Sequence, residues 1–149
     1  MRAIAAVVLL AGLFGLVPSV RADEECSDAT LKGSFGVSGS GTFPNGTPFV
    51  TIGRFSFDGA GNLTATAILN LSDSTTFRRV FTGTYTVDAD CTGSAVLVEV
   101  GAGGSGGHFD FVIDDNGTEI RLIRTAPGIL GLFTFVGKKQ FPGSERRSE

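Results

Sequence analysis

Apolar and polar residues alternate over most of the chain after residue 30, in short runs that end at turn-forming residues. Phe, Val, Ile, Leu and Thr dominate the runs, and Gly, Asn, Asp and Pro separate them. Alternation with a period of two is typical of strands with one buried face, because successive side chains point to opposite sides of a sheet. The pattern predicts eight strands, at residues 31–41, 49–58, 62–71, 75–87, 92–100, 108–114, 118–125 and 129–137.

The order of these segments favours an all-β fold, a single eight-stranded antiparallel up-and-down barrel. Consecutive strands with short connections form a meander, and closing the meander into a barrel removes its exposed edges. Gly33, Gly53 and Gly83 fall within predicted strands, where a small barrel coils sharply. A two-sheet sandwich is the alternative that this pattern leaves open.

The alternation also assigns one face of each strand to the interior. The expected inward residues of the first four strands are large and apolar: Leu31, Phe35, Val37, Phe49, Phe55, Phe57, Leu63, Leu69, Leu71, Phe77, Phe81, Tyr85 and Val87. Serine, threonine and charged residues dominate the opposite parity. Charged residues with inward parity are therefore the exceptions at which function is to be sought.

Two arginines are such exceptions, since Arg79 shares the parity of Phe77 and Arg124 that of Leu122. A buried guanidinium is costly unless it is paired. The arginines could lie at a barrel mouth and reach solvent, hold an anionic oxygen of a lipophilic ligand, or form an internal ion pair. Glu99 is the natural counter-charge, although its strand is apolar on both faces and parity does not place it.

Tyr85 is the only tyrosine of the chain, and it lies on the inward aromatic row. It could be a core aromatic whose hydroxyl finds one partner, or a hydrogen-bond donor to a bound carbonyl or ether. The candidate ligand-binding residues are therefore Arg79, Tyr85, Glu99 and Arg124. If the barrel is an enzyme, Tyr85 and Glu99 are the candidate catalytic residues.

The first 22 residues have the layout of a secretory signal peptide, with Arg2, an apolar run over residues 3–17 and the ending Val20-Arg21-Ala22. A transmembrane helix is the competing interpretation, but the run is shorter than the roughly 20 residues that a bilayer span needs. We expect cleavage near Ala22, a barrel domain over 23–138 and a solvated tail over 139–149. The mature protein would then be secreted or periplasmic.

Both cysteines, Cys26 and Cys91, lie after the predicted cleavage point. An exported chain meets an oxidising compartment, so the simplest expectation is one disulfide between them. Two free thiols for redox chemistry are the alternative, which no C-x-x-C spacing supports.

Composition and motifs argue against several classes of function. Cleavage removes Arg2 and Arg21 from the twelve basic residues, which leaves ten against fifteen acidic ones and a net charge of −5. Nucleic-acid binding depends on clustered Lys and Arg, so no nucleic-acid partner is expected. The stretch GAGGSG at 101–106 matches a dinucleotide-binding pattern but leads into a strand instead of a helix, so we interpret it as a flexible loop.

Residues 107–125 contain the only histidine, His108, followed by Asp110, an acidic group at residues 114–119 and the pair Asn116 and Gly117. Asn-Gly between two alternating segments is a strong hairpin signal, and the spacing of the carboxylates does not fit an EF-hand. Parity turns His108 and Asp110 outward. One histidine and two paired cysteines do not make an ordinary zinc site, so we predict no metal and no cofactor.

The meander, together with the segments GRFSFDGAGNLT (53–64), RRVFTGTYTVDADCTG (78–93) and HFDFVIDDNGTEIRLIRT (108–125), resembles the secreted bacterial allene-oxide-cyclase-like barrels, a calycin-like group. The resemblance implies a calycin-like barrel and an apolar cavity in which a few polar groups steer ring closure. No catalytic motif matches residue by residue, so the resemblance assigns no catalytic residue.

Three functions are compatible with this sequence. The favoured one is a secreted barrel that binds a small apolar or amphipathic, possibly anionic, molecule in its lumen. The second is a cyclase or isomerase acting in the same cavity. The third is a structural or surface interaction module with a solid core. An enzymatic activity is therefore left open.

Overall fold

The structure is a computed structural model that describes residues 25–72, 75–102, 107–126 and 131–141. The predicted signal peptide, most of the glycine-rich segment 101–106 and residues 142–149 of the predicted tail lie outside these ranges.

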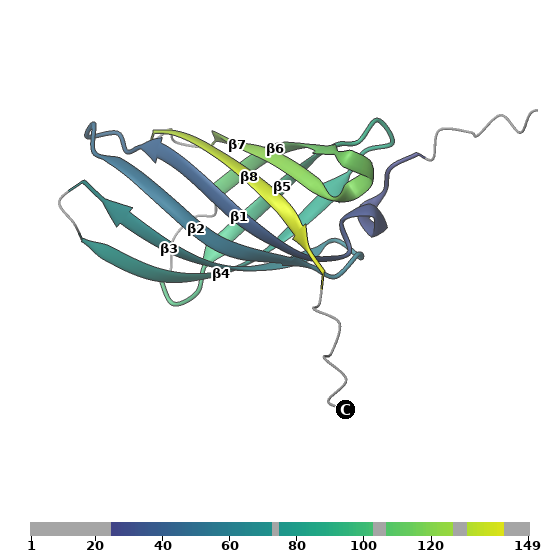
Figure 1. Cartoon of the computed structure of the whole chain (residues 1–149), viewed down its shortest axis with the longest axis horizontal. Helices are drawn as coiled ribbons and strands as arrows, with labels where there is room; N and C mark the ends of the chain where they lie inside the picture. The colour runs from purple at the N-terminus through teal and green to yellow at the C-terminus, as the bar shows by residue number, and fades with distance from the viewer. Residues whose placement is uncertain (1–24, 73–74, 103–106, 127–130, 142–149) are drawn as a thin grey trace, which may run out of the picture.

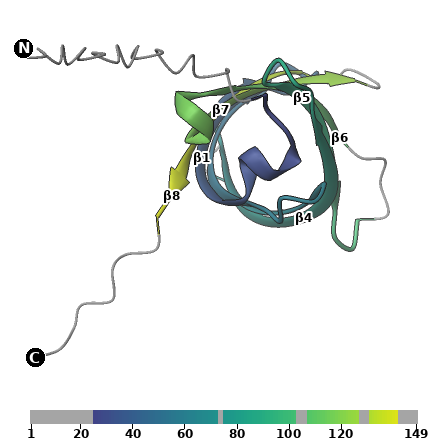
Figure 2. The same ribbon diagram turned by 90° about the vertical axis from the view of Figure 1, so that its right-hand side faces the viewer.

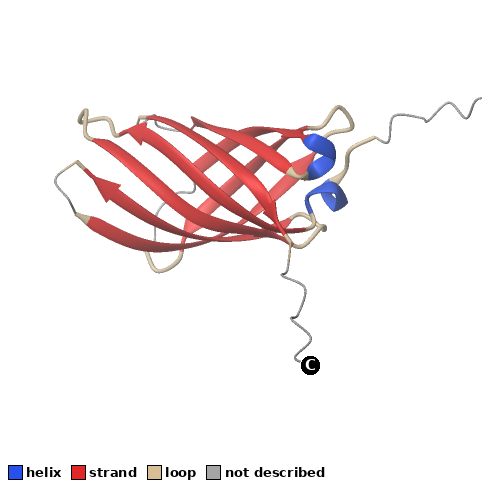
Figure 3. Ribbon diagram, viewed as in Figure 1, coloured by secondary structure: helices blue, strands red, loops and turns tan. Residues whose placement is uncertain are grey.

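The described chain forms a closed antiparallel barrel of eight strands, as predicted (Figure 1). Each strand pairs with the next, and the last pairs with the first, so the alternative of a two-sheet sandwich is wrong. The strands are β1 (Gly33–Thr42), β2 (Pro48–Phe57), β3 (Asn62–Leu71), β4 (Thr76–Val87), β5 (Thr92–Glu99), β6 (Gly107–Asp114), β7 (Glu119–Ala126) and β8 (Leu132–Gln140). Two short 3₁₀ helices, η1 (Asp28–Leu31) and η2 (Asp115–Gly117), both lie at one end of the barrel (Figure 3).

Two strands have boundaries that differ from the prediction by more than one residue. Leu31 belongs to η1 and not to the first strand; it is fully buried, so its apolar character reflects packing of the helix and not strand alternation. β8 begins and ends three residues later than expected. It extends to Gln140 because its pairing with β1 continues as far as Ser34 and Gln140. The barrel therefore continues past the expected domain boundary at residue 138.

The apolar faces that the alternation predicted point into the barrel and form its core. The buried core consists of Leu31, Phe35, Val37, Phe55, Phe57, Leu63, Ala65, Tyr85, Ala95, Leu97, Phe109, Phe111, Ile113, Ile120 and Leu122. Phe77 is an exception, since 39% of it is exposed in spite of its inward parity. The paired register of β4 with β5 begins only at Phe81 and Glu99, so the start of β4 extends past its neighbour and Phe77 lies at the rim.

One end of the barrel is closed by η1, and we call it the plugged end. Viewed along the barrel, η1 lies across the ring of strands (Figure 2). A disulfide joins Cys26 to Cys91, as predicted, and the Cys26 N–H donates to the Ala89 carbonyl at 3.2 Å. These contacts attach the segment before η1 to the β4–β5 turn, which holds Leu31 inside the barrel.

The connection between β6 and β7 also lies at the plugged end. The predicted hairpin is present, but its turn is the 3₁₀ helix η2, in which Asp115, Asn116 and Gly117 all have positive φ. A Cβ on Gly117 would lie 3.0 Å from the side chain and carbonyl oxygen of Thr30, so this position favours glycine both for its φ of 79° and for its contact with η1.

Candidate functional site

The half of the barrel opposite η1 contains a cavity of about 270 Å³, which we call the distal cavity. β1 runs away from η1, so the end of β1 and the start of β2 lie at the distal end, as do the start of β4 and the end of β5. Its wall is mainly apolar and includes seven phenylalanines: Phe43, Phe49, Phe55, Phe81, Phe109, Phe133 and Phe135. Among the residues that the structure describes, the charged members of this lining are Arg79, Glu99 and Arg124.

Three phenylalanines pack against one another on one side of the distal cavity. The ring centroids of Phe49 and Phe133 lie 4.9 Å apart in an edge-to-face arrangement, and Phe43 lies 4.9 Å from Phe49 and 5.7 Å from Phe133. Gly41 pairs with both Phe49 and Phe133, and a Cβ there would lie within 2.7 Å of each ring. Glycine is therefore required where the two rings converge.

This use of glycine was missed in the sequence. Gly39 and Gly41 continue the inward parity of Phe35 and Val37, yet they contribute no side chain to the lumen. Two glycines in a row on the inward face of one strand are the signal that could have indicated a change from core to cavity, because an inward glycine leaves space or admits a neighbouring ring.

Arg79 and Glu99 form an ion pair at the distal cavity. An internal ion pair was one of the three interpretations of the inward arginines that the sequence left open. The Arg79 Nη1 donates to Glu99 Oε2 at 2.7 Å, and the two side chains are 40% and 28% exposed. The register pairs Glu99 with Phe81, so Glu99 shares the inward face with Ala95 and Leu97. The sequence of its own strand did not show which face it takes. The Arg79 guanidinium also lies 5.6 Å from the centroid of the Phe77 ring.

Arg124 lines the same cavity without such a partner. Its guanidinium carbon lies 5.1 Å from the centroid of the Phe133 ring, a cation–π distance, and the residue is half-buried. Arg124 pairs with Phe109, next to a register shift at the start of β6. Within the part of the chain that the structure describes, Arg124 has neither an ion pair nor a hydrogen bond from its side chain.

Tyr85 lies at the plugged end and does not line the distal cavity. Its hydroxyl donates to the Asp28 carbonyl at 2.9 Å and accepts from the Gly59 N–H at 3.0 Å, and only 2% of the residue is exposed. Asp28 is held in turn, since its Oδ1 accepts from the Val87 N–H at 2.8 Å. Burial raises the pKa of the Tyr85 phenol above its ordinary value. The structure thus gives Tyr85 the role of a core aromatic that anchors η1.

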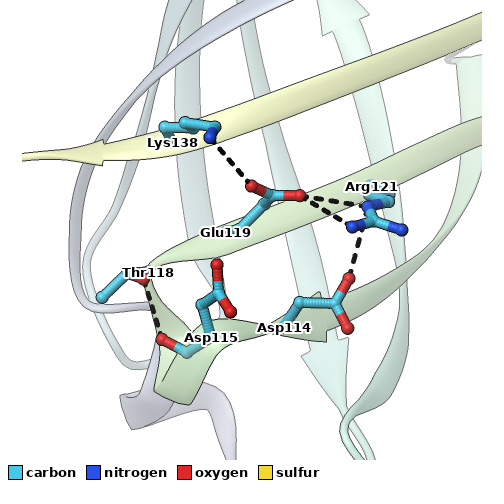
Figure 4. A network of polar contacts seen from close by, with 6 residues as sticks. All are labelled: Asp114, Asp115, Thr118, Glu119, Arg121 and Lys138. Atoms are coloured by element: carbon cyan, nitrogen blue, oxygen red, sulfur yellow. Dashed lines mark hydrogen bonds and ion pairs between the residues drawn. The ribbon is translucent and has the colours of Figure 1, made fainter.

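The polar residues near η2 form a surface network and not a site (Figure 4). Glu119 is 8% exposed and accepts from Arg121 Nη2 at 3.0 Å, while Lys138 Nζ lies 3.3 Å from its other oxygen. Asp114 lies 3.3 Å from Arg121 Nε. Hydrogen bonds from Arg121 and Lys138 hold the pKa of Glu119 below its ordinary value. The carboxylates of Asp114 and Glu119 are thus paired with Arg121 and Lys138, and none of these residues lines the distal cavity.

His108 and Asp110 both face solvent on β6, which confirms their outward parity. Among the described residues, no group of three or more His, Cys, Asp or Glu side chains could hold a metal ion. None of the helices in the described ranges is long and apolar enough to cross a membrane.

No protein-family model matches the chain, and no curated protein matches it. Solved structures with a similar fold include the redesigned β-barrel mFAP1 bound to DFHBI, which is 19% identical, with a TM-score of 0.51 over 75% of this chain and 97% of that one. The redesigned barrel b11L5F_LGL is 17% identical, with a TM-score of 0.56 over 76% of this chain and 95% of that one. EF1p2_mFAP2b bound to DFHBI is 16% identical, with a TM-score of 0.53 over 74% and 94%. These likenesses support the barrel fold, and the resemblance to allene-oxide-cyclase-like barrels is not confirmed by them.

Proposed function

We propose that the protein binds a small apolar or amphipathic molecule in the distal cavity. The observation that carries this proposal is an aromatic cavity of about 270 Å³ that contains an arginine without a carboxylate partner among the described residues. Ligand sites are typically apolar hollows with a few polar groups that orient the ligand. The cavity also argues against a module with a solid core, because the distal half of the lumen is not filled.

Two further observations support this proposal. Redesigned barrels of the same fold have been solved with DFHBI bound, so the architecture is compatible with uptake of a small organic molecule. The disulfide between Cys26 and Cys91 suits an oxidising compartment, in line with the predicted signal peptide. We therefore propose that binding takes place in the periplasm or outside the cell.

The test is to fill the cavity without disturbing the outer surface. Ala67 lines the distal cavity on β3, and its neighbour Thr66 faces outward. Native mass spectrometry of gently purified protein and titration with a panel of lipophilic anions and neutral aromatics would measure binding to the wild type. We expect Ala67→Phe to abolish saturable binding because the added ring occupies the cavity, and Thr66→Phe to retain it.

Binding that survives in Ala67→Phe would place the ligand outside the lumen and contradict the proposal. The absence of both a co-purified ligand and any saturable binding by the wild-type protein would overturn it as well. Circular dichroism and thermal unfolding of both variants would show that the barrel is retained, so that loss of binding is not loss of fold.

A cyclase or isomerase acting in the same cavity is the second candidate. It is favoured by Glu99, a carboxylate on the cavity wall that Arg79 holds in place and that could move a proton of a bound substrate. Tyr85 is not part of this candidate site, because it lies at the plugged end. Catalysis needs stabilisation of the transition state beyond that of the substrate. Glu99→Gln would then abolish turnover of a bound substrate and spare its affinity, and unchanged turnover would exclude this site.

A further inference from the structure

We infer that the ligand of the distal cavity is a compact aromatic monoanion and that Arg124 binds its anionic group. This inference rests on the proposed binding in the lumen and specifies the class of molecule that the lumen takes. Three properties of the cavity carry it: its charge, its size and the nature of its wall.

The charged side chains that line the cavity leave one positive charge uncompensated. Arg79 and Glu99 neutralise each other at 2.7 Å, whereas Arg124 has no ion-pair partner among the described residues. A neutral ligand would displace water from the Arg124 guanidinium and offer no counter-charge, which is unfavourable. A monoanion restores neutrality, and a planar carboxylate fits the fork of guanidinium N–H donors.

The cavity volume limits the ligand to a small molecule. The cavity of about 270 Å³ corresponds to about nine water molecules at the ~30 Å³ that each occupies in the liquid. A ligand enclosed there has on the order of ten non-hydrogen atoms by the same measure. A long-chain lipid would not fit inside, which restricts the enclosed part to a ring with a short acidic substituent.

The wall favours an aromatic body over an aliphatic one. Phe43, Phe49 and Phe133 already pair with one another at 4.9 to 5.7 Å, and the Phe49–Phe133 pair is edge to face. A bound ring can extend this arrangement, because aromatic rings attract beyond the contribution of their buried area. Arg124 lies over the Phe133 ring, so its guanidinium is held beside the aromatic cluster and does not extend freely into solvent.

Calorimetric titration with matched probes tests the inference on the wild-type protein. The probes are phenylacetate, its neutral isostere phenylacetamide, and cyclohexylacetate, which keeps the charge and loses the aromatic ring. We expect phenylacetate to bind about tenfold or more tightly than phenylacetamide, because it alone pairs with Arg124. Cyclohexylacetate should bind more weakly than phenylacetate and should still be preferred over the neutral amide.

Substitutions then assign the preference for anions to Arg124. Arg124→Gln should reduce the preference for phenylacetate over phenylacetamide to within about twofold, and Arg124→Lys should keep part of it through its charge. Arg78→Gln is the matched control, since Arg78 is exposed on the outer face beside Arg79 and its loss changes the net charge equally. We expect Arg78→Gln to leave the preference unchanged.

The outcomes separate this inference from the proposed function. If neutral and anionic probes bind the wild type equally well and Ala67→Phe abolishes the binding of both, the inference is overturned. The lumen would still be a binding site. An anion preference that persists in Arg124→Gln and disappears in Arg78→Gln would also overturn it, because the anion would then lie on the outer surface. No binding of any probe to the wild type would overturn both proposals.

Discussion

The Arg79 guanidinium and the Glu99 carboxylate meet at 2.7 Å between β4 and β5, where both side chains line the distal cavity. This pair determines the charge of the cavity, since it neutralises one of its two arginines. Arg124, on the wall formed by β7, lies next to Phe133 and has no ion-pair partner among the described residues. The electrostatic character of the lumen therefore depends on a contact between residues that are 20 positions apart in the sequence.

The contribution of this ion pair to stability should be small. Both side chains are partly exposed, at 40% and 28%, so solvent screens their attraction. In a double-mutant cycle of Arg79→Met and Glu99→Leu, we expect a coupling energy of about 1 kcal/mol or less, measured by urea unfolding. A cycle of Arg78→Met with Glu99→Leu should show no coupling. A coupling energy well above ~1 kcal/mol would contradict the screening of the pair by solvent.

Loss of the disulfide should destabilise the protein strongly. Cys26 and Cys91 are 65 residues apart, and the chain-entropy model gives about 4 kcal/mol for a loop of that length. We expect Cys26→Ala/Cys91→Ala to lower the free energy of unfolding by roughly this amount in urea, and reductant to lower the wild type comparably. Reductant should not affect the double variant. Two thiols that alkylate in the native protein without reductant would show that the disulfide is absent.

The backbone at Cys91 offers a second test of the same region. Cys91 has φ of 67°, a left-handed conformation that costs a residue with a Cβ roughly 1–2 kcal/mol relative to glycine. Once the disulfide is removed, Cys26→Ala/Cys91→Gly should be more stable than Cys26→Ala/Cys91→Ala by about 1 kcal/mol. Equal stability of the two variants would mean that the turn relaxes to an ordinary conformation without the disulfide.

Tyr85 should contribute to stability through its hydroxyl. Tyr85→Phe leaves the Gly59 N–H and the Asp28 carbonyl without their partner in a nearly buried position, so we expect a loss of about 1–3 kcal/mol in urea unfolding. Ligand affinity in the distal cavity should be unchanged. A selective loss of affinity in Tyr85→Phe would indicate that the hydroxyl contacts the ligand after all.

The same tyrosine should make stability fall at alkaline pH. Burial raises the pKa of Tyr85 in the folded state, so above about 10, where an unfolded tyrosine ionises, only the unfolded state loses the proton. The stabilisation is complete below the pKa of Tyr85 in the unfolded state and is lost as pH rises through its pKa in the folded state. The chain has one tyrosine and no tryptophan, so phenolate absorbance follows this group alone. A phenolate that forms at its ordinary pKa in the folded protein would contradict the burial.

Glu119 should contribute at the acidic end. Hydrogen bonds from Arg121 and Lys138 lower its pKa in the folded state, so its stabilisation is present above the unfolded pKa of about 4.3 and is lost as pH falls through the folded value. The urea midpoint of Glu119→Gln should therefore depend less on pH below about 5 than that of the wild type. Asp115→Asn, which removes a carboxyl group outside the ion pairs, should keep the wild-type dependence. An identical profile for Glu119→Gln and wild type would contradict the network.

The candidate site could be predicted in part. Arg79 and Arg124 were identified because parity placed each among inward apolar residues, and both do line the cavity. Glu99 could not be placed, since the apolar residues on both faces of β5 remove the contrast on which parity depends. Its position follows from the β4–β5 register, which pairs it with Phe81. A lumen that binds a ligand was the favoured prediction, but the position and size of the cavity were not predicted, because they depend on inward glycines such as Gly41 and on rings from neighbouring strands.

The sequence by itself determined the strands, their order, the faces they bury and the two cysteines that could pair. These follow from local geometry, because side chains alternate along a strand whatever lies around it. Only the tertiary structure decided the height of each residue along the barrel. Arg79 and Tyr85 share one face of β4, yet Arg79 lines the distal cavity and Tyr85 lies beneath η1. Alternation determines which face of a strand a residue occupies, but not its height along the barrel. That height depends on the hydrogen-bond register around the closed ring and on the end at which η1 packs.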